Sequence, residues 1–230
     1  MPADGRPEVA IVDYGMGNLY SVRHACTHVG LRASITSDPA ELRNADGVIL
    51  PGVGAFADAM ATLNRLDLAR AIREFVASGR PLLGVCLGFQ LLMSESEEFG
   101  CHAGLGIIEG AVARFADPRL HGRSLKVPQI GWNGIRRVRR EAGVPDPWNG
   151  TLLDGMVDGE SMYFVHSYVV KPANPSTRLS MSTYGDVEFC SSVLFQNVTA
   201  CQFHPERSGP EGLMVYRNLV DRIYAGGIRA

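Results

Sequence analysis

Residues 81–93 read PLLGVCLGFQLLM, and this stretch decides the fold class. The apolar run at 81–85 predicts a short buried strand, and residues 87–93 predict a helix that begins directly after it. Between them lies Gly84-Val-Cys-Leu-Gly88, a glycine-flanked cysteine with the form of a nucleophile elbow. In such an elbow, a tight strand-to-helix turn lifts the side chain out of the sheet. The stretch therefore predicts an α/β fold that presents Cys86 between a strand and a helix.

Strand and helix signals alternate through the first half of the chain. Strands are expected at residues 8–12, 31–36 and 47–50. Helices are expected where apolar side chains recur at helical spacing, one from residue 19 to the glycine at position 30 and one from residue 68 to the glycine at position 79. Strands that alternate with helices predict a mostly parallel central sheet with helices on both faces.

The second half of the chain is rich in strand signals. Strands are expected at residues 107–115, 134–138, 161–171, 178–184, 188–195 and 199–203. They predict an antiparallel or mixed extension of the sheet, and a final helix is expected with Pro210 in its first turn. No linker or change of composition divides the chain, so we expect a single domain over residues 1–230.

The composition excludes several classes of protein. The chain has 230 residues, of which 46% are hydrophobic, and 22 Lys and Arg against 24 Asp and Glu leave a net charge of −2. That balance argues against binding to nucleic acid or to a membrane surface. The first residues lack the apolar segment of a secretion signal, and no apolar run is long enough to span a membrane. Five cysteines without C-x-x-C spacing indicate a reducing, cytoplasmic setting and no metal site, and no cofactor is predicted.

The setting of Cys86 has a physical rationale. Unpaired N–H groups and the dipole at a helix N-terminus favour a thiolate. The N–H of Leu87 is placed to bind the oxyanion of a tetrahedral intermediate. The alternative is that Cys86 is a buried structural cysteine in a glycine-flanked turn.

A base and an orienting group are expected near the C-terminus, because a thiolate nucleophile requires both. His204 is expected at the end of a strand, and Glu206 follows two residues later. In an extended segment, residues two apart point to the same side, so the imidazole and the carboxylate could form a local hydrogen bond. Alternatively, the two are a surface histidine and a solvated glutamate.

GVCLGFQ at 84–90 together with QFHPE at 202–206 resembles the class I, triad-type glutamine amidotransferases. Four further motifs, DYGMGN at 13–18, PGVG at 51–54, PQIGWN at 128–133 and YFVHSY at 163–168, resemble those of the glutaminase subunits of imidazole glycerol phosphate synthase. The resemblance implies that Cys86 attacks the side-chain amide of glutamine. It further implies that His204 transfers protons, that Glu206 orients His204 and that water hydrolyses the resulting thioester.

The same resemblance assigns the binding of glutamine and of the oxyanion. The second oxyanion donor would come from Val53, whose flanking glycines could allow its peptide to flip as a switch, although they could also form an ordinary tight turn. The implied glutamine-binding residues are Gly52, Gln90, Glu98, His166, Ser167 and Tyr168. Glu98 belongs to the acidic run at 95–98, and such runs are usually solvated.

The resemblance also implies a protein partner, a (βα)₈-barrel cyclase that forms a heterodimer with the chain and receives its ammonia. The implied docking residues are Asn18, Gly131, Trp132, Tyr163 and Arg207. Trp132 could equally belong to the core, and position 207 carries Arg where the resemblance predicts Lys. The basic run RRVRR at 136–140 is expected to be a solvated strand face.

Two rival functions stay open. The chain could be the glutaminase subunit of another synthase, such as the one that makes pyridoxal phosphate. It could also be a catalytically silent binding protein with the same fold. The motifs at 130–133 and 166–168 favour histidine biosynthesis over the first rival, and the intact Cys86, His204 and Glu206 argue against the second.

Overall fold

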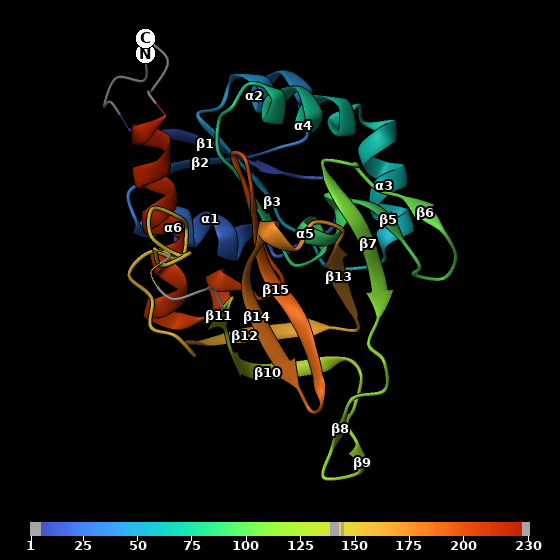
Figure 1. The fold of residues 1–230 in the computed structure, drawn as a ribbon. Coiled ribbons are helices and arrows are strands. Elements are labelled where there is room, and N and C mark those ends of the chain that lie inside the picture. Colours follow the sequence, from blue (N-terminus) through green and yellow to red (C-terminus); the bar gives the residue numbers. More distant parts are fainter. Residues whose placement is uncertain (1–5, 139–142, 144, 227–230) are drawn as a thin grey trace.

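A computed structural model describes residues 6–138, 143 and 145–226 (Figure 1). Its main feature is a large mixed sheet that helices cover on both faces. Five strands form the parallel part of the sheet in the order β2-β1-β3-β4-β16. They are β1 (Glu8–Val12), β2 (Arg32–Thr36), β3 (Gly47–Leu50), β4 (Leu82–Val85) and β16 (Val198–Cys201). The predicted α/β class is therefore confirmed.

The predicted antiparallel and mixed extension lies beyond β16. The sheet continues in the order β15-β13-β7-β5-β6, in which β5 and β7 are parallel and the other neighbours are antiparallel. These strands are β15 (Val187–Phe195), β13 (Tyr168–Pro172), β7 (Ile108–Arg114), β5 (Met93–Ser96) and β6 (His102–Ala103). Strand β14 (Arg178–Tyr184) pairs with β15 and with the short β11 (Arg136–Arg137). Two further pairs lie apart from the main sheet, β10 (Gln129–Gly134) with β12 (Ser161–His166) and β8 (Arg119–Leu120) with β9 (Arg123–Ser124).

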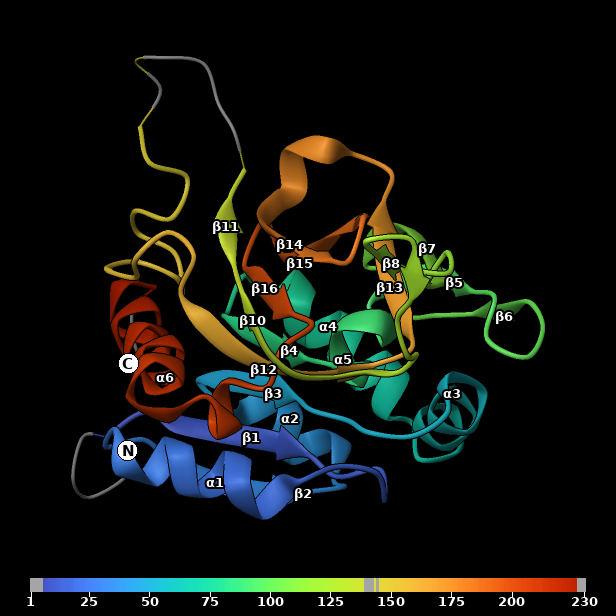
Figure 2. The ribbon, with the colours of Figure 1, turned by 90° about the horizontal axis from the view of Figure 1, so that it is seen from below.

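Two hydrophobic clusters lie on opposite faces of the sheet, and the residues of β1 show how they are divided. Its side chains alternate, so Ala10 and Val12 join one cluster and Val9 and Ile11 join the other. The first cluster lies under the helices α2 (Pro39–Asn44), α3 (Phe56–Arg65), α4 (Leu68–Ala77) and α5 (Leu87–Leu91). The second lies under α1 (Leu19–His28) and α6 (Gly209–Ala225), which Figure 2 shows side by side. The short 3₁₀ helices are η1 (Pro175–Thr177) and η2 (Pro205–Arg207).

Several predicted elements differ from those in the structure. The helix predicted at 87–93 ends at Leu91, because Met93 turns into β5 and pairs with Ile108 of β7. The strand predicted at 161–171 is divided at Ser167 into β12 and β13, which belong to different sheets. The strand predicted at 134–138 is likewise two pieces, since β10 ends at Gly134. Helices α2 and α3 were not predicted.

The basic run at 136–140 is only partly described. Arg136 is exposed, as expected, but Arg137 is half-buried. Its Nε lies 2.8 Å from Oδ2 of Asp146, and its guanidinium stacks 4.1 Å from the ring centroid of Trp148. Arg137 is therefore packed rather than solvated, and residues 139–140 lie outside the described part of the chain.

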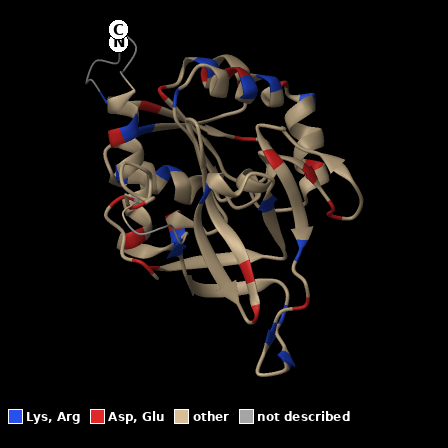
Figure 3. Cartoon of the chain, in the orientation of Figure 1, with Lys and Arg blue, Asp and Glu red and all other residues tan. Residues whose placement is uncertain are grey.

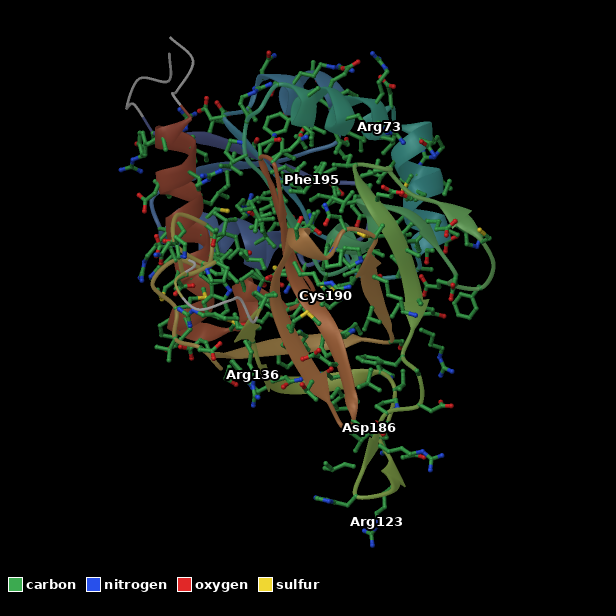
Figure 4. All side chains as sticks on the ribbon, viewed as in Figure 1. Arg73, Arg123, Arg136, Asp186, Cys190 and Phe195 are labelled. Carbon is green, nitrogen blue, oxygen red and sulfur yellow. The ribbon has the colours of Figure 1, made fainter. Side chains whose placement is uncertain are left out.

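Along most of the chain, positions of Lys and Arg are interspersed with positions of Asp and Glu, as the colours of Figure 3 show. The β8–β9 hairpin differs, because the charged residues of its two strands are both arginines, Arg119 and Arg123. It extends from the body of the molecule, with Arg123 near its tip (Figure 4). Asp186, at the turn between β14 and β15, accepts a hydrogen bond from the backbone N–H of Arg119 at 2.7 Å, which attaches the base of the hairpin to the sheet. None of the helices in the described ranges is both long and apolar enough to cross a membrane.

Candidate active site

Cys86 lies in a strained turn between β4 and α5. Its φ of 54° and ψ of −109° are unusual for a residue with a side chain, and such strain is typical of functional sites. The turn requires glycine at position 88, because a Cβ there would lie 1.7 Å from the carbonyl oxygen of Leu50. The side chain of Cys86 is 6% exposed, and the residue lines a cavity of about 660 Å³. The local structure is therefore the elbow that the sequence predicts.

Two groups flank the Cys86 sulfur. The thiol points toward the carbonyl oxygen of Val165 at 3.8 Å, and the side-chain amide of Gln202 donates to the sulfur at 3.6 Å. Gln202 is fully buried just after β16. Gln202 belongs to the QFHPE motif at 202–206, and no role was predicted for it. Its place beside the nucleophile's strand follows from the parallel pairing of β4 with β16.

His204 and Glu206 meet as predicted, but by a different route. Strand β16 ends at Cys201, and His204 precedes the 3₁₀ turn η2 that contains Glu206. The turn brings Nδ1 of His204 within 2.8 Å of Oε1 of Glu206. Both side chains are almost completely buried, at 5% and 1% exposure, so neither is the surface group of the alternative interpretation.

The charges around His204 favour its imidazolium form. Burial lowers the pKa of His204, but the adjacent Cys86 and the hydrogen-bonded Glu206 carboxylate outweigh burial and raise that pKa to about 10. Nε2 of His204, the ring nitrogen that does not bind Glu206, has no hydrogen-bond partner among the described residues. Glu206 therefore holds the His204 ring from its Nδ1 side and leaves Nε2 available for proton transfer.

The expected oxyanion donors occupy a different arrangement from the one that binds an oxyanion. The N–H of Leu87 donates to the carbonyl oxygen of Gly52 at 3.4 Å. That carbonyl belongs to the same peptide unit as the N–H of Val53. Val53 is 44% exposed and lines the cavity together with Gly54, whereas Gly52 is buried. In this structure the Gly52 carbonyl oxygen, an acceptor, thus occupies the Leu87 N–H. Binding of an oxyanion is expected to use the N–H groups of Leu87 and Val53 as its two donors.

Tyr14 fixes the residue that precedes this peptide. Its buried hydroxyl donates to the carbonyl oxygen of Pro51 at 2.7 Å. A Cβ on Gly52 would lie 1.9 Å from the same hydroxyl, so only glycine fits there. Burial, followed by the effect of Cys86, raises the pKa of Tyr14, which keeps the hydroxyl protonated as a donor. The motif at 13–18 therefore supports the glycine-rich loop at 51–54.

Five of the six residues expected to bind glutamine line the cavity, whereas Gly52 is buried and is not part of its lining. The five are Gln90, Glu98, His166, Ser167 and Tyr168. Nε2 of Gln90 donates to Oε1 of Gln202 and to the carbonyl oxygen of Tyr168, both at 3.1 Å, which leaves the Gln90 carbonyl oxygen free of partners among the described residues.

Glu98 differs from the rest of its acidic run. Glu95 and Glu97 are exposed, whereas Glu98 is 9% exposed and its Oε2 accepts the N–H of Phe56, the first residue of α3, at 2.8 Å. The solvated interpretation of this residue is therefore wrong. Arg114 of β7, for which no role was predicted, also lines the cavity and has no ion pair with a described residue.

His166 is held neutral within an aromatic surrounding. Its Nδ1–H donates to the carbonyl oxygen of Tyr168 at 2.9 Å, and its ring packs against Phe115, Phe164 and Phe189. Burial is the main cause that lowers the pKa of His166 to about 4, although the bond to Tyr168 opposes it. Nε2 is therefore an unprotonated acceptor, and it has no partner among the described residues.

This pKa predicts an acid-dependent loss of stability. A folded-state pKa below the unfolded value of about 6.5 has no effect above that pH and destabilises the fold as the pH falls from about 6.5 toward 4. At pH 4.5, His166 should cost about 2 to 3 kcal/mol of unfolding free energy, from about 1.4 kcal/mol per pH unit. His166→Asn keeps a donor for Tyr168 and should lose that much less stability than the parent between pH 7 and pH 4.5 in urea unfolding.

The control is His121→Asn, since His121 is exposed in the β8–β9 turn. It should follow the parent at every pH. Parallel stability curves for the parent and for His166→Asn would show that His166 is not buried in its neutral form.

Four of the five expected docking residues, Gly131, Trp132, Tyr163 and Arg207, lie together on one surface. Trp132 is 60% exposed on β10, so it is not a core residue. Its ring meets the half-buried Tyr163 of β12 edge-on at 6.0 Å, and the exposed Arg207 stacks 4.5 Å from the Tyr163 ring centroid. Gly131 lies beside Trp132 opposite Phe164 in the β10–β12 pair. Asn18 is exposed at the N-terminus of α1 and makes no capping hydrogen bond there.

Within residues 6–138, 143 and 145–226, no group of three or more His, Cys, Asp and Glu side chains is arranged to hold a metal ion. The five cysteines are free, and all but Cys101 are buried.

Comparisons with known proteins identify the family. The model of the class I glutamine amidotransferases matches residues 10–222. Imidazole glycerol phosphate synthase subunit HisH of Syntrophotalea carbinolica is 48% identical over 93% of this chain and 99% of its own length. HisH of Moorella thermoacetica is 45% identical over 95% and 97%.

Solved structures agree on the fold. A glutamine amidotransferase has a TM-score of 0.68 at 19% identity, and PurLQS from Thermotoga maritima has a TM-score of 0.70 at 18% identity. Each comparison covers 94% of this chain and 98% of the other. The chain therefore belongs to the class I glutamine amidotransferases and, within them, to the HisH subunits of imidazole glycerol phosphate synthase.

Proposed function

We propose that this chain hydrolyses glutamine to glutamate and ammonia, and that it delivers the ammonia to a cyclase subunit that makes imidazole glycerol phosphate for histidine biosynthesis. The observation that carries this proposal is the burial of Cys86 at the wall of the cavity, together with the buried pair of His204 and Glu206, whose side chains meet at 2.8 Å. Membership of the HisH family supplies the substrate and the acceptor reaction.

The reaction begins with attack by the Cys86 thiolate on the side-chain amide carbon of glutamine. The imidazolium of His204 then gives its proton to the amide nitrogen, the C–N bond breaks and ammonia leaves. A γ-glutamyl thioester remains on Cys86. Neutral His204 next removes a proton from water, which attacks the thioester and releases glutamate and the thiolate. Glu206 holds the ring through Nδ1 and stabilises the imidazolium in both steps.

The tetrahedral intermediates need donors for their oxyanion. The N–H of Leu87 is one, and the N–H of Val53 becomes the second when the Gly52–Val53 peptide rotates. The same rotation removes the Gly52 carbonyl oxygen from Leu87. One peptide flip thus exchanges an acceptor for a donor, which suits a glutaminase that works only when its partner is engaged.

The charges of the cavity suit a zwitterionic amino acid. Glu98 places a carboxylate at the wall, and Arg114 places a guanidinium there. Gln90, through its free carbonyl oxygen, and His166, through Nε2, offer acceptors to the ammonium group or to the amide of glutamine. Gly52, Ser167 and Tyr168 complete the proposed glutamine site, with Ser167 and Tyr168 at the bend between β12 and β13.

The surface formed by Asn18, Gly131, Trp132, Tyr163 and Arg207 is the proposed docking face for a (βα)₈-barrel cyclase. Exposed tryptophan and tyrosine bury large areas on association and are favoured in interfaces. Direct delivery is required because ammonia released into neutral water is protonated and loses its nucleophilicity. We place the chain and its partner in the cytoplasm, in keeping with a pathway of small polar metabolites.

Reconstitution tests this proposal. The chain, a cyclase subunit of imidazole glycerol phosphate synthase, the cyclase substrate and glutamine should yield glutamate and imidazole glycerol phosphate in equal amounts. The parallel mixture contains the synthase subunit that makes pyridoxal phosphate and should give no such coupling. Coupling to pyridoxal phosphate instead would replace the proposed pathway, and an absence of glutamate in both mixtures would indicate a silent binding protein.

A further inference from the structure

Ser208, which follows the 3₁₀ turn η2, belongs to none of the motifs used above, although it is fully buried. Its Oγ donates to the carbonyl oxygen of His204 at 2.7 Å and accepts the backbone N–H of Tyr163 at 3.0 Å. The N–H of His204 donates in turn to the carbonyl oxygen of Tyr163 at 2.8 Å. These three hydrogen bonds form a closed ring that joins the backbone of His204 to one residue of β12.

The ring has no close substitute among the neighbouring groups. The only other described donor to the His204 carbonyl is the N–H of Arg207, at 3.0 Å, which closes η2 but does not reach β12. The first turn of α6 also presses Ser208 into place. A Cβ on Gly212 would lie 2.7 Å from Cβ of Ser208 and 2.1 Å from the carbonyl oxygen of Pro205. The close packing of α6 thus fixes the position of Ser208, and the Ser208 hydroxyl binds the backbone of His204.

The other end of this link reaches the molecular surface. The side chain of Tyr163 contacts Trp132 and Arg207, which belong to the proposed docking face, and its ring lies 6.5 Å from that of His204. A partner that shifts Tyr163 would therefore shift the backbone to which His204 is bonded. The link runs through backbone atoms, so it transmits displacement without requiring the Tyr163 side chain to touch Cys86.

We propose that Ser208 is a positioning residue, whose hydroxyl holds His204 against β12 and ties the imidazole to the docking face. This inference rests on the proposed glutaminase function. Loss of the hydroxyl leaves the N–H of Tyr163 without its acceptor, and of the three hydrogen bonds only that from the His204 N–H to the Tyr163 carbonyl remains to join the turn to β12. Because a displacement of about 1 Å at a reacting group can cost about 100-fold in rate, a small movement of His204 suffices.

The test compares Ser208→Ala with Ser180→Ala in the complex of the chain with the cyclase subunit and its substrate. Ser180 is a matched control, since its fully buried hydroxyl also has two hydrogen-bond partners, Ser191 and Ser192, away from the cavity. Ser208→Ala should lower kcat for glutamine about 10- to 100-fold and change KM less than about threefold. The pH range of activity should also shift, because His204 leaves the charges that raise its pKa.

Equal kcat values and pH profiles for Ser208→Ala and Ser180→Ala would overturn the proposal. If Ser208→Ala does not fold, the Ser208→Cys variant tests the role of the hydroxyl instead. Its longer and weaker S–H donor should give a kcat below that of the parent with an unchanged circular dichroism spectrum, whereas a parental kcat and pH profile would refute the role. The proposed function is judged separately, because it requires only that the parent hydrolyse glutamine.

Discussion

Cys86→Ala is expected to abolish glutamine-dependent synthesis of imidazole glycerol phosphate while added ammonium salt still supports it. Without the sulfur, no thioester can form, and loss of a nucleophile from a triad lowers kcat by about 10⁴-fold or more. Ammonia from solution bypasses the glutaminase and enters the cyclase reaction directly. The measurement is product formation by the complex with glutamine, and then with ammonium chloride at a pH high enough to supply free ammonia.

Cys101→Ala is the matched control, because Cys101 is the exposed cysteine and lies outside the cavity lining. It should retain both activities. If Cys86→Ala lost the ammonia-dependent activity as well, Cys86 would be a structural residue on which the complex depends, and the elbow would have no catalytic role.

The second large effect is expected from the partner. The chain alone should hydrolyse glutamine about 10² to 10³ times more slowly than it does with the cyclase subunit and the cyclase substrate, since this is the usual cost of one missing oxyanion donor. The physical reason is the bond from the Leu87 N–H to the Gly52 carbonyl oxygen, which blocks the place of the oxyanion. Steady-state glutamate release with and without the partner measures the ratio.

Alkylation of Cys86 by iodoacetamide distinguishes the reactivity of the Cys86 thiolate from the binding of the oxyanion. This reaction needs the thiolate but no oxyanion donor, so the partner should change its rate far less than it changes glutamine hydrolysis. The Cys101→Ala variant serves here too, because it removes the exposed thiol that would react first. Fast glutamate release by the isolated chain, equal to that of the complex, would contradict a gate at Val53.

The sequence predicts those parts of the site that depend on local geometry. The apolar run before Cys86 and the glycines around it suffice for the elbow, because Gly88 has no room for a Cβ. The pairing of His204 with Glu206 was expected from an extended strand, yet a 3₁₀ turn brings them together. Their separation of two residues joined by a proline permits both routes, so the contact was predicted although its backbone was not.

Other features depend on contacts between distant segments and could not be predicted from local patterns. Glu98 lies two residues beyond β5 and is buried where its carboxylate accepts the N–H of Phe56 at the start of α3, a contact that an acidic run does not reveal. Gln202 reaches Cys86 only because β16 lies next to β4. The direction of the Gly52 carbonyl is one of two orientations that the same residues allow, so no sequence pattern determines it.

The hydroxyl of Tyr14 has a consequence for where the enzyme can move. It anchors the carbonyl of Pro51 and fills the space beside Gly52, whereas Val53 and Gly54 face open solvent. The proposed rotation at Val53 would therefore be confined to the Gly52–Val53 peptide, because Pro51 is held on the side toward the sheet. Tyr14 contributes no reacting group, yet under this proposal it would determine which peptide of the loop can rotate.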